Sequence, residues 1–326
     1  MKPLMNRLKI NTSGANITRY ISLLVIVVLV AVITSINPNF LRPLNIKNLL
    51  TDMTTFLVMG SGITFVLLIG SIDLSLGGVC SFSAVLCATL LGALGGAGGI
   101  LLPLLFGILA GLFNGFLFTF VKIPSFIATL GTMSIWNSLA LVLSGSGSVS
   151  VPRAQGEIFD FTKITVIDIF TVYFLIGAAV VIIAYILLRR TSLGKYIYAI
   201  GANEKAARMA GVPIRKTKMF AYVVSAFLSS MMGILLVAKL KSASPYVGDP
   251  LTLMCIAAAV LGGVSLSGGR GNALWMTVGC AVVAIIQNGI SAVGLDSFYQ
   301  QIVFGLLLLI AIFITADRSS RNIIIK

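Results

Sequence analysis

Long runs of apolar residues alternate with short polar stretches along the whole chain. Each run has a length of about 20 residues, which is what a helix needs to cross the hydrocarbon core of a bilayer. The runs lie at about 17–36, 52–70, 76–96, 99–121, 125–144, 167–188, 218–238, 251–267, 273–294 and 298–316. The pattern predicts an all-α, polytopic integral membrane protein with about ten transmembrane helices.

Three of the predicted spans have unclear limits. Only residues 71–75 separate the second run from the third, and a glycine run separates the third from the fourth. The eighth run is the shortest, so it is either a span or a re-entrant segment. We therefore expect one or more broken or re-entrant segments, because irregular backbone inside a membrane is tolerated only where protein or a cavity surrounds it.

Composition supports the membrane assignment. Hydrophobic residues make up 58% of the 326 residues and charged residues only 10%, whereas soluble domains average about 45–50% and about 25%. The mean hydropathy is +1.07. Such a chain cannot cover its own surface with polar groups. We find no linker or change in composition, so we expect a single permeation domain over residues 1–326.

The net charge of +14, from 23 basic and nine acidic residues, would suggest nucleic-acid binding in a soluble protein. In a membrane protein it reports orientation instead, because cytoplasmic loops are enriched in Lys and Arg. With ten spans, both termini share one side, and 17 of the 23 basic residues fall on that side. The sequence predicts cytoplasmic termini, an uncleaved first span and no nucleic-acid partner.

Candidate catalytic chemistry is sparse. The sequence contains no histidine, which removes His-based acid–base catalysis and His-containing metal sites. The four cysteines, Cys80, Cys87, Cys255 and Cys280, fall inside apolar runs and form no Cys-x-x-Cys pair. We expect no catalytic residue, no metal site and no cofactor, and therefore a protein that is not an enzyme.

The longest connection on the predicted cytoplasmic side is 189–218. Within it, Asn203 is a good N-cap, Glu204 suits the positive start of a helix, and Gly211 followed by Pro213 can end one. These signals predict a two-turn helix over 204–210. Two interpretations stay open: a basic loop on anionic lipid, or a small helix that docks into a groove on a cytoplasmic partner. The candidate docking residues are Asn203, Glu204, Ala206, Ala207, Arg208 and Gly211.

Asp73 is the only carboxylate within the stretch of apolar and small residues 53–121. Burying it in a span costs at least about 2.5–3.5 kcal/mol, so it needs a partner or water. The setting indicates a helix break, and Asp73 is expected either to cap the next helix as a hinge or to line a polar path. Residues 262–271 form a second, glycine-rich break without a nucleotide-binding pattern. The candidate path or hinge residues are Asp73, Ser75, Asn114, Gly262, Gly263 and Asn288.

At these segments the sequence resembles the ribose-type sugar permeases of bacterial ATP-binding-cassette importers, to which the branched-chain amino acid permeases are related more distantly. The resemblance extends from Asn37 to about Asp317. The blocks that carry it are Ile72-Asp73-Leu74-Ser75-Leu76-Gly77, Pro124-Ser125-Phe126-Ile127-Ala128-Thr129-Leu130-Gly131, Tyr198 to Arg208, and Gly262 to Gly271.

The resemblance implies a pore-forming subunit in a bacterial inner membrane, which itself hydrolyses nothing. It implies three partners: a cytoplasmic cassette ATPase, a periplasmic or lipid-anchored sugar-binding protein, and a second permease subunit, identical or different. The family's coupling helix maps onto Asn203–Gly211. Ribose-like pentose or hexose is the expected substrate.

The chain departs from the family at two places. Thr252-Leu253-Met254 stands where these permeases usually have Glu-Leu-Asp, and Ser71 replaces a second glycine. From the predicted topology we expect Thr252 near the outer face, where it would alter an outer gate or the docking of the binding protein. Pairing with a different permease that keeps the carboxylates is one hypothesis for this departure.

An ion-coupled secondary transporter with broken helices is the alternative function. Such proteins usually need ionisable groups inside the membrane, and Asp73 is almost alone there. The segment 203–211 has no role in that interpretation. A multi-span enzyme is disfavoured because the sequence lacks a His, Cys or paired-carboxylate constellation.

Overall fold

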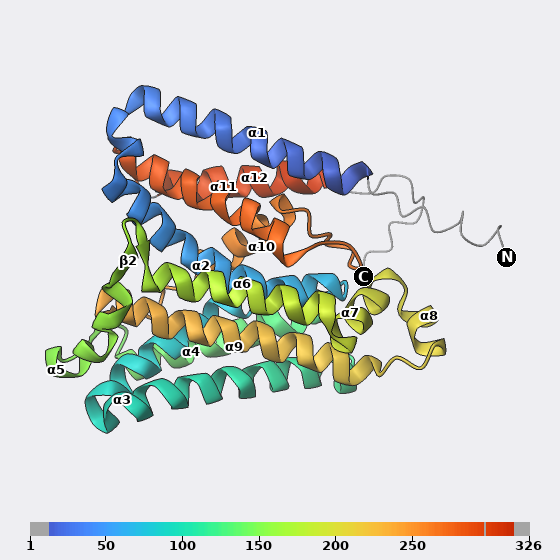
Figure 1. The fold of residues 1–326 in the computed structure, drawn as a ribbon. Helices are drawn as coiled ribbons and strands as arrows, with labels where there is room; N and C mark the ends of the chain where they lie inside the picture. The colour runs from blue at the N-terminus through green and yellow to red at the C-terminus, as the bar shows by residue number, and fades with distance from the viewer. Residues whose placement is uncertain (1–12, 297, 316–326) are drawn as a thin grey trace.

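The computed structural model describes residues 13–296 and 298–315. The long helices run side by side as one bundle (Figure 1), which confirms the all-α prediction. The helical elements are α1 (Ser13–Ile36), η2 (Pro38–Leu41), α2 (Pro43–Leu68), α3 (Leu76–Phe116), η3 (Leu117–Val121), α4 (Ser125–Ser144), α5 (Arg153–Gly156), η4 (Glu157–Lys163), α6 (Val172–Arg190), α7 (Ser192–Ala202), α8 (Glu204–Met209), α9 (Ile214–Leu240), α10 (Leu251–Leu261), α11 (Ala273–Ala292) and α12 (Phe298–Thr315).

Four very short strands complete the described part: β1 (Val149–Ser150), β2 (Thr165–Ile167), β3 (Phe170–Thr171) and β4 (Ser242–Ala243). β1 pairs antiparallel with β4, and β2 pairs antiparallel with β3. Both pairs lie in connections between helices and only tie loops together.

Local sequence explains where several helices begin. Proline stands in the first turn of α2, where its missing N–H is not needed. Thr171 caps α6 by accepting a hydrogen bond from the N–H of Phe174 at 3.2 Å. Asn272 caps α11 in the same way, with the N–H of Leu274 at 2.9 Å. Short polar side chains at these positions satisfy N–H groups that have no partner inside the helix.

α3 contains the boundary between the third and fourth apolar runs. Gly95 has φ 72° and ψ −170°, a conformation outside the helical region, and glycine adopts it without the steric penalty of a side chain. The element is therefore two helices joined at Gly95, which fits the boundary that the glycine run predicts.

Six helical elements in the described residues are long and apolar enough to cross a membrane, with α3 and η3 counted as one: Pro43–Leu68, Leu76–Val121, Ser125–Ser144, Val172–Arg190, Ile214–Leu240 and Ala273–Ala292. The predicted count of about ten is not confirmed. α10 has 11 residues and spans about 16 Å, roughly half of a 30 Å hydrocarbon core. The eighth apolar run is thus a half-length helix followed by irregular backbone.

α2 and α9 form the centre of the bundle. In each, 72% of the most apolar window is buried, against 22% in α4. Outer helices expose large apolar side chains, such as Leu24 on α1 and Val142 on α4. A surface this apolar is suited to lipid rather than to water.

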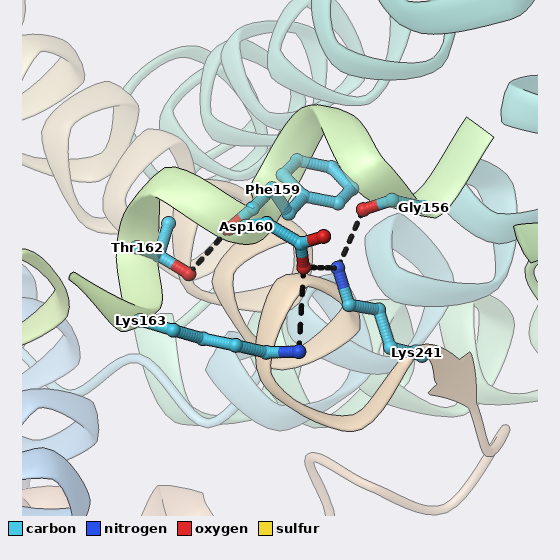
Figure 2. Close-up of polar contacts among 6 residues, drawn as sticks. All are labelled: Gly156, Phe159, Asp160, Thr162, Lys163 and Lys241. Carbon is cyan, nitrogen blue, oxygen red and sulfur yellow. Dashed lines mark hydrogen bonds and ion pairs between the residues drawn. The ribbon is translucent and has the colours of Figure 1, made fainter. Parts of the chain in front are cut away.

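The two ends of the bundle differ (Figure 1). We call the end with the β2–β3 hairpin and α5 the β2 end, and the opposite end with α7 and α8 the α8 end. At the β2 end, Lys241 follows α9 and ties it to η4, since its Nζ donates to Asp160 Oδ1 at 2.9 Å and to the carbonyl of Gly156. Figure 2 shows this lysine between the two acceptors. These two hydrogen bonds fasten the end of α9 to the loop region of α5 and η4.

Candidate functional site

Asp73 lies in the extended segment between α2 and α3 and is fully buried. Its Oδ1 accepts hydrogen bonds from the N–H of Ser75 at 2.9 Å and from the hydroxyl of Ser75 at 2.6 Å. Its Oδ2 accepts one from the hydroxyl of Ser225 on α9 at 2.8 Å. No Lys or Arg of the described residues forms an ion pair with Asp73. Three donors, rather than a cation, hold this carboxylate.

The hydrogen bonds continue from Asp73 to two further helical segments. Asn114 donates its Nδ2 to the hydroxyl oxygen of Ser75 at 2.8 Å, and Thr132 of α4 donates its hydroxyl to Asn114 Oδ1 at 2.8 Å. All five side chains are buried. We call Asp73, Ser75, Asn114, Thr132 and Ser225 the Asp73 network. It connects the α2–α3 break with the second half of α3, with α4 and with α9.

The structure thus brings together three of the predicted path or hinge residues, Asp73, Ser75 and Asn114. The expectation that Asp73 caps α3 needs correction. Ser75 occupies the N-cap position, and the N–H of Gly77 donates instead to Thr252 Oγ1 at 2.9 Å. Asp73 instead accepts the N–H of the N-cap residue Ser75 itself.

Thr252 is buried, with 4% of its surface exposed. Its side chain is therefore not exposed on the surface of this subunit, and its expected place near the outer face stays a prediction. Because α10 is only half the length of a span, its first turn lies deep in the bundle, where Thr252 satisfies an N–H at the start of α3. The threonine at this position has a structural use in the interior and is not available for docking of another protein.

Gly262 and Gly263 follow α10 and begin the loop to α11. This loop packs on the end of α2, where the N–H of Gly269 donates to the carbonyl of Leu68 at 2.8 Å. It also packs on α7, where the hydroxyl of Tyr198 donates to the carbonyl of Gly271 at 2.9 Å. Gly268 and Gly269 both have positive φ, and a Cβ on either would contact neighbouring backbone. Three segments distant in sequence therefore meet at the α8 end.

Asn288 does not join the Asp73 network. It lies on α11, and its Oδ1 accepts a hydrogen bond from Asn45 Nδ2 at 2.9 Å. Asn45 belongs to the first turn of α2 and also bonds the carbonyl of Phe40. Asn288 thus fastens the start of α2 to α11.

The connection 189–218 contains two helices. The two-turn helix predicted for 204–210 is present as α8, Glu204–Met209, and Asn203 caps it by accepting the N–H of Ala206 at 3.0 Å. Gly211, with φ +80°, ends it, and the N–H of Val212 returns to the carbonyl of Ala207. α7 was not predicted. Its sequence does carry helix signals, because Thr191 caps it by accepting the N–H of Gly194 and its buried residues Ile197 and Ile200 are three positions apart.

Two basic residues tie α8 to the bundle through Glu204. Its carboxylate accepts from Arg208 at 3.0 Å and from Lys218 of α9 at 2.8 Å. Partial burial alone would raise the pKa of Glu204, but the two cations more than offset this effect and lower it below its usual value. Lys218 also lies 4.4 Å from the ring centroid of Phe118. Glu204 is therefore charged at neutral pH and fixes the start of α8.

α8 presents one face outward and one inward. Ala207 is buried against the bundle, whereas Lys205, Ala206, Arg208 and Ala210 are exposed and Met209 is 90% exposed. The outward face is small, basic and carries one flexible apolar side chain. It is suited to contact with another protein, and Ala207 belongs to the attachment rather than to that face.

The described residues offer little for bond-breaking chemistry. No group of three or more His, Cys, Asp or Glu residues in them could hold a metal ion, and all four cysteines are buried. The hydrogen bonds of the Asp73 network hold helices from distant parts of the chain together. Ser225 was not among the predicted residues, because a serine inside an apolar helix carries no sign of its tertiary partner.

Comparison with known proteins gives a consistent result. The family model described as "Branched-chain amino acid transport system / permease component" matches residues 45–312. The ribose import permease protein RbsC of Bacillus subtilis is 34% identical over 90% of this chain and 91% of its own length. RbsC of Escherichia coli K12 is 31% identical over 90% of this chain and 92% of its own length. The L-arabinose transporter permease protein AraH of Azospirillum brasilense is 32% identical over 92% and 87%.

One solved structure is similar in fold. PsaBC from Streptococcus pneumoniae in complex with Fab matches 86% of this chain and 95% of its own, with a TM-score of 0.51 and 17% identity. At this identity the match supports the arrangement of helices alone.

Proposed function

The chain belongs to the branched-chain amino acid transport system / permease component family, and from this premise we propose that it is the membrane-embedded permease subunit of an ATP-driven, binding-protein-dependent importer of a monosaccharide. In this proposal ATP is hydrolysed by a separate cassette subunit, and this chain provides the path and the movement. A soluble or lipid-anchored binding protein delivers the sugar at the opposite face.

The structural observation that carries the proposal is α8. A helix of six residues is marginal in isolation, yet this one is capped at Asn203, ended at Gly211 and ion-paired to α9 through Glu204. Its outward face remains without a partner in the described chain. We propose that this face, with Ala206 and Arg208, is the ATPase-coupling surface, and that 189–218 is the coupling loop of a single permease domain over 1–326.

The substrate class rests on the relatives. The proteins RbsC, AraH and AlsC are named for ribose, L-arabinose and D-allose. Because the similarity extends over about nine tenths of each chain, we propose a monosaccharide of this kind as the transported molecule. Which sugar it is depends largely on the binding protein.

We propose ten membrane segments. α3 and η3 contribute two, separated at Gly95, and α1, α10 and α12 join α2, α4, α6, α9 and α11. The excess of basic residues favours a cytoplasmic α8 end with both termini on the same side. The β2 end then faces the binding protein.

The Asp73 network acts as a hinge in this proposal. Its five side chains are buried inside one subunit, so they do not line a path, but they join the segments that must move against one another. Gly262 and Gly263 give the backbone at the α8 end freedom to follow. The path itself runs along the exposed face of α4, between this subunit and a second permease, identical or different.

The test is uptake of radiolabelled ribose, arabinose and allose into proteoliposomes that contain this chain, its cassette ATPase and its binding protein. ATP-dependent uptake of one of these sugars is expected. Arg208→Glu should abolish uptake and binding-protein-stimulated ATP hydrolysis together. The matched control is Arg153→Glu, an exposed arginine at the β2 end, which should keep ATPase assembly. Equal ATPase binding by wild type and Arg208→Glu would count against the coupling surface.

A further inference from the structure

A short loop enters the bundle from the β2 end. Residues 244–250 connect β4 with α10. α10 is only about 16 Å long and its last residue lies toward the α8 end, so its first residue lies inside the bundle. The N–H of Gly248 donates to Ser81 Oγ at 2.9 Å, and a Cβ on Gly77 would lie 2.5 Å from the carbonyl oxygen of Gly248. The loop therefore rests on the first turns of α3, well below the β2 end.

Asp249 is the carboxylate of this loop, and its side chain is not closed off. Oδ1 accepts a hydrogen bond from Asn137 Nδ2 of α4 at 3.0 Å. Neither Lys nor Arg of the described chain pairs with Asp249, and its Oδ2 has no hydrogen-bond partner there. Asn137 is the thirteenth residue of α4, about 18 Å from the start of that helix. The carboxylate is thus exposed at a depth where lipid would surround an isolated subunit.

An exposed carboxylate at that depth requires a polar neighbour or water. On α4 next to Asn137, Ser134 and Ser138 are exposed, among the apolar side chains that this helix also exposes. Close to Asp249, Tyr246 turns a ring outward with 56% of its surface exposed. Asp249, Asn137 and Tyr246 thus gather polar atoms on a part of the surface that is otherwise apolar.

Accepting oxygens, an amide and an exposed aromatic ring are what a monosaccharide needs. A carboxylate accepts hydrogen bonds from sugar hydroxyls, and hydrogen bonds to charged groups are the stronger ones. An aromatic ring packs against the apolar C–H face of a sugar while its hydroxyl stays polar. The ligand class that matches all three groups is a neutral polyhydroxylated molecule.

We propose that Asp249 contacts the hydroxyl groups of the sugar in the translocation path, that Asn137 is a positioning residue for this carboxylate, and that Tyr246 packs on the sugar. This inference rests on the proposed function and adds a substrate contact to it. The free oxygen of Asp249 accepts a hydroxyl as the sugar passes from the binding protein toward the α8 end.

The test combines Asp249→Asn with deoxy sugars. Uptake is measured in the complete transporter with whichever of ribose, arabinose and allose the wild type carries, and with each of its monodeoxy analogues. Because the same binding protein serves wild type and variant, its own preference cancels from the ratio of their uptake rates. We expect uptake of the parent sugar to fall about tenfold or more, and ATP hydrolysis stimulated by the binding protein to change less than about twofold.

For one deoxy analogue, the one that lacks the contacted hydroxyl, the ratio of wild-type to variant uptake should be close to one. Asn137→Ala should make the difference in uptake between the parent sugar and this analogue smaller than it is in the wild type. Asp168→Asn, an exposed aspartate in the β2–β3 turn, is the matched control and should change neither rate. An equal fall for the parent sugar and every analogue, or unchanged uptake, would overturn the inference. ATP-dependent uptake absent in the wild type would instead overturn the proposed function, and this inference with it.

A second variant covers the case in which Asp249→Asn does not accumulate. All four native cysteines are buried, so Asp249→Cys offers one reactive thiol to a membrane-impermeant maleimide. We expect labelling from the β2 side and slower labelling in the presence of the transported sugar, with Val166→Cys labelled equally in both conditions. Labelling of Asp249→Cys that the sugar does not slow would contradict the inference.

Discussion

Ser225→Ala should destabilise the protein far more than the same substitution one turn later. Both Ser225 and Ser229 lie on α9 and are fully buried. The hydroxyl of Ser225 donates to Asp73 Oδ2 at 2.8 Å, whereas the hydroxyl of Ser229 donates to the carbonyl of Ser225 at 2.9 Å. That carbonyl also belongs to the hydrogen-bonded backbone of the helix. Only the first substitution leaves a buried carboxyl oxygen without its donor.

The expected magnitudes follow from these contacts. Leaving a buried acceptor without its donor costs about 1–3 kcal/mol, so Ser225→Ala should lower the free energy of unfolding by this amount. Ser229→Ala should cost less than about 1 kcal/mol, because the carbonyl keeps its helical bond. In thermal unfolding of the detergent-solubilised protein, the first change corresponds to a midpoint lower by roughly 2–8 °C.

A double-mutant cycle connects the effect to Asp73. In an Asp73→Ala background, Ser225→Ala should cost less than about 1 kcal/mol, because the carboxyl oxygen that accepts from Ser225 is gone. The same variants should lose sugar uptake in proportion to their loss of free energy of unfolding. Equal midpoints for Ser225→Ala and Ser229→Ala would refute the reasoning, as would a Ser225→Ala effect that is the same with and without the carboxylate.

Three further predictions concern other parts of the molecule. Ala207→Asp should detach α8 and abolish binding of the cassette ATPase in pull-down assays, because it places an unpaired carboxylate in a buried position; binding at the wild-type level would show that the residue is exposed. Gly77→Ala should lower stability by about 1–3 kcal/mol in thermal unfolding, because its Cβ would lie 2.5 Å from the carbonyl oxygen of Gly248, and an unchanged midpoint would contradict this close approach. Hydrogen bonds from Lys241 and Lys163 lower the pKa of Asp160, so its contribution is present at neutral pH and is lost only as pH falls below about 4; the difference in unfolding midpoint between wild type and Asp160→Asn should be constant from about pH 5 to 8, and a difference that varied there would contradict the ion pair.

Local sequence patterns predicted the elements that depend on local physics. Apolar runs located the long helices, since lipid demands an apolar surface and internal backbone hydrogen bonds. Asn203 and Gly211 located α8, because capping depends on residues within one turn. The break around Asp73 was visible because glycines and an isolated carboxylate interrupt an apolar run.

Tertiary partners were not predictable in the same way. Nothing in the sequence shows that Ser225 faces Asp73, or that Ala207 rather than its neighbours faces the bundle. The run 251–267 is apolar for the length of a span, whereas the helix within it ends at Leu261. Asn288 bonds Asn45, more than 240 residues away, and no local pattern connects two such residues.

The Asp249 site illustrates the same limit. Asp249 lies just before the apolar run 251–267 and Asn137 lies inside the run 125–144, and no local pattern indicates that the two meet. Their hydrogen bond exists because the loop 244–250 descends beside α4. The depth of that loop follows from the short α10, which only the packing of the glycine-rich segment after it reveals.

The central claim is that this chain moves a monosaccharide with energy from ATP hydrolysis by a separate subunit. The most direct measurement is sugar uptake into proteoliposomes that contain the chain with its cassette ATPase and binding protein, with ATP supplied on the side of α8 and with no ion gradient. The account predicts uptake that requires ATP, both partners and Arg208. Uptake driven by a proton or sodium gradient in the absence of the ATPase would contradict it and favour a secondary transporter.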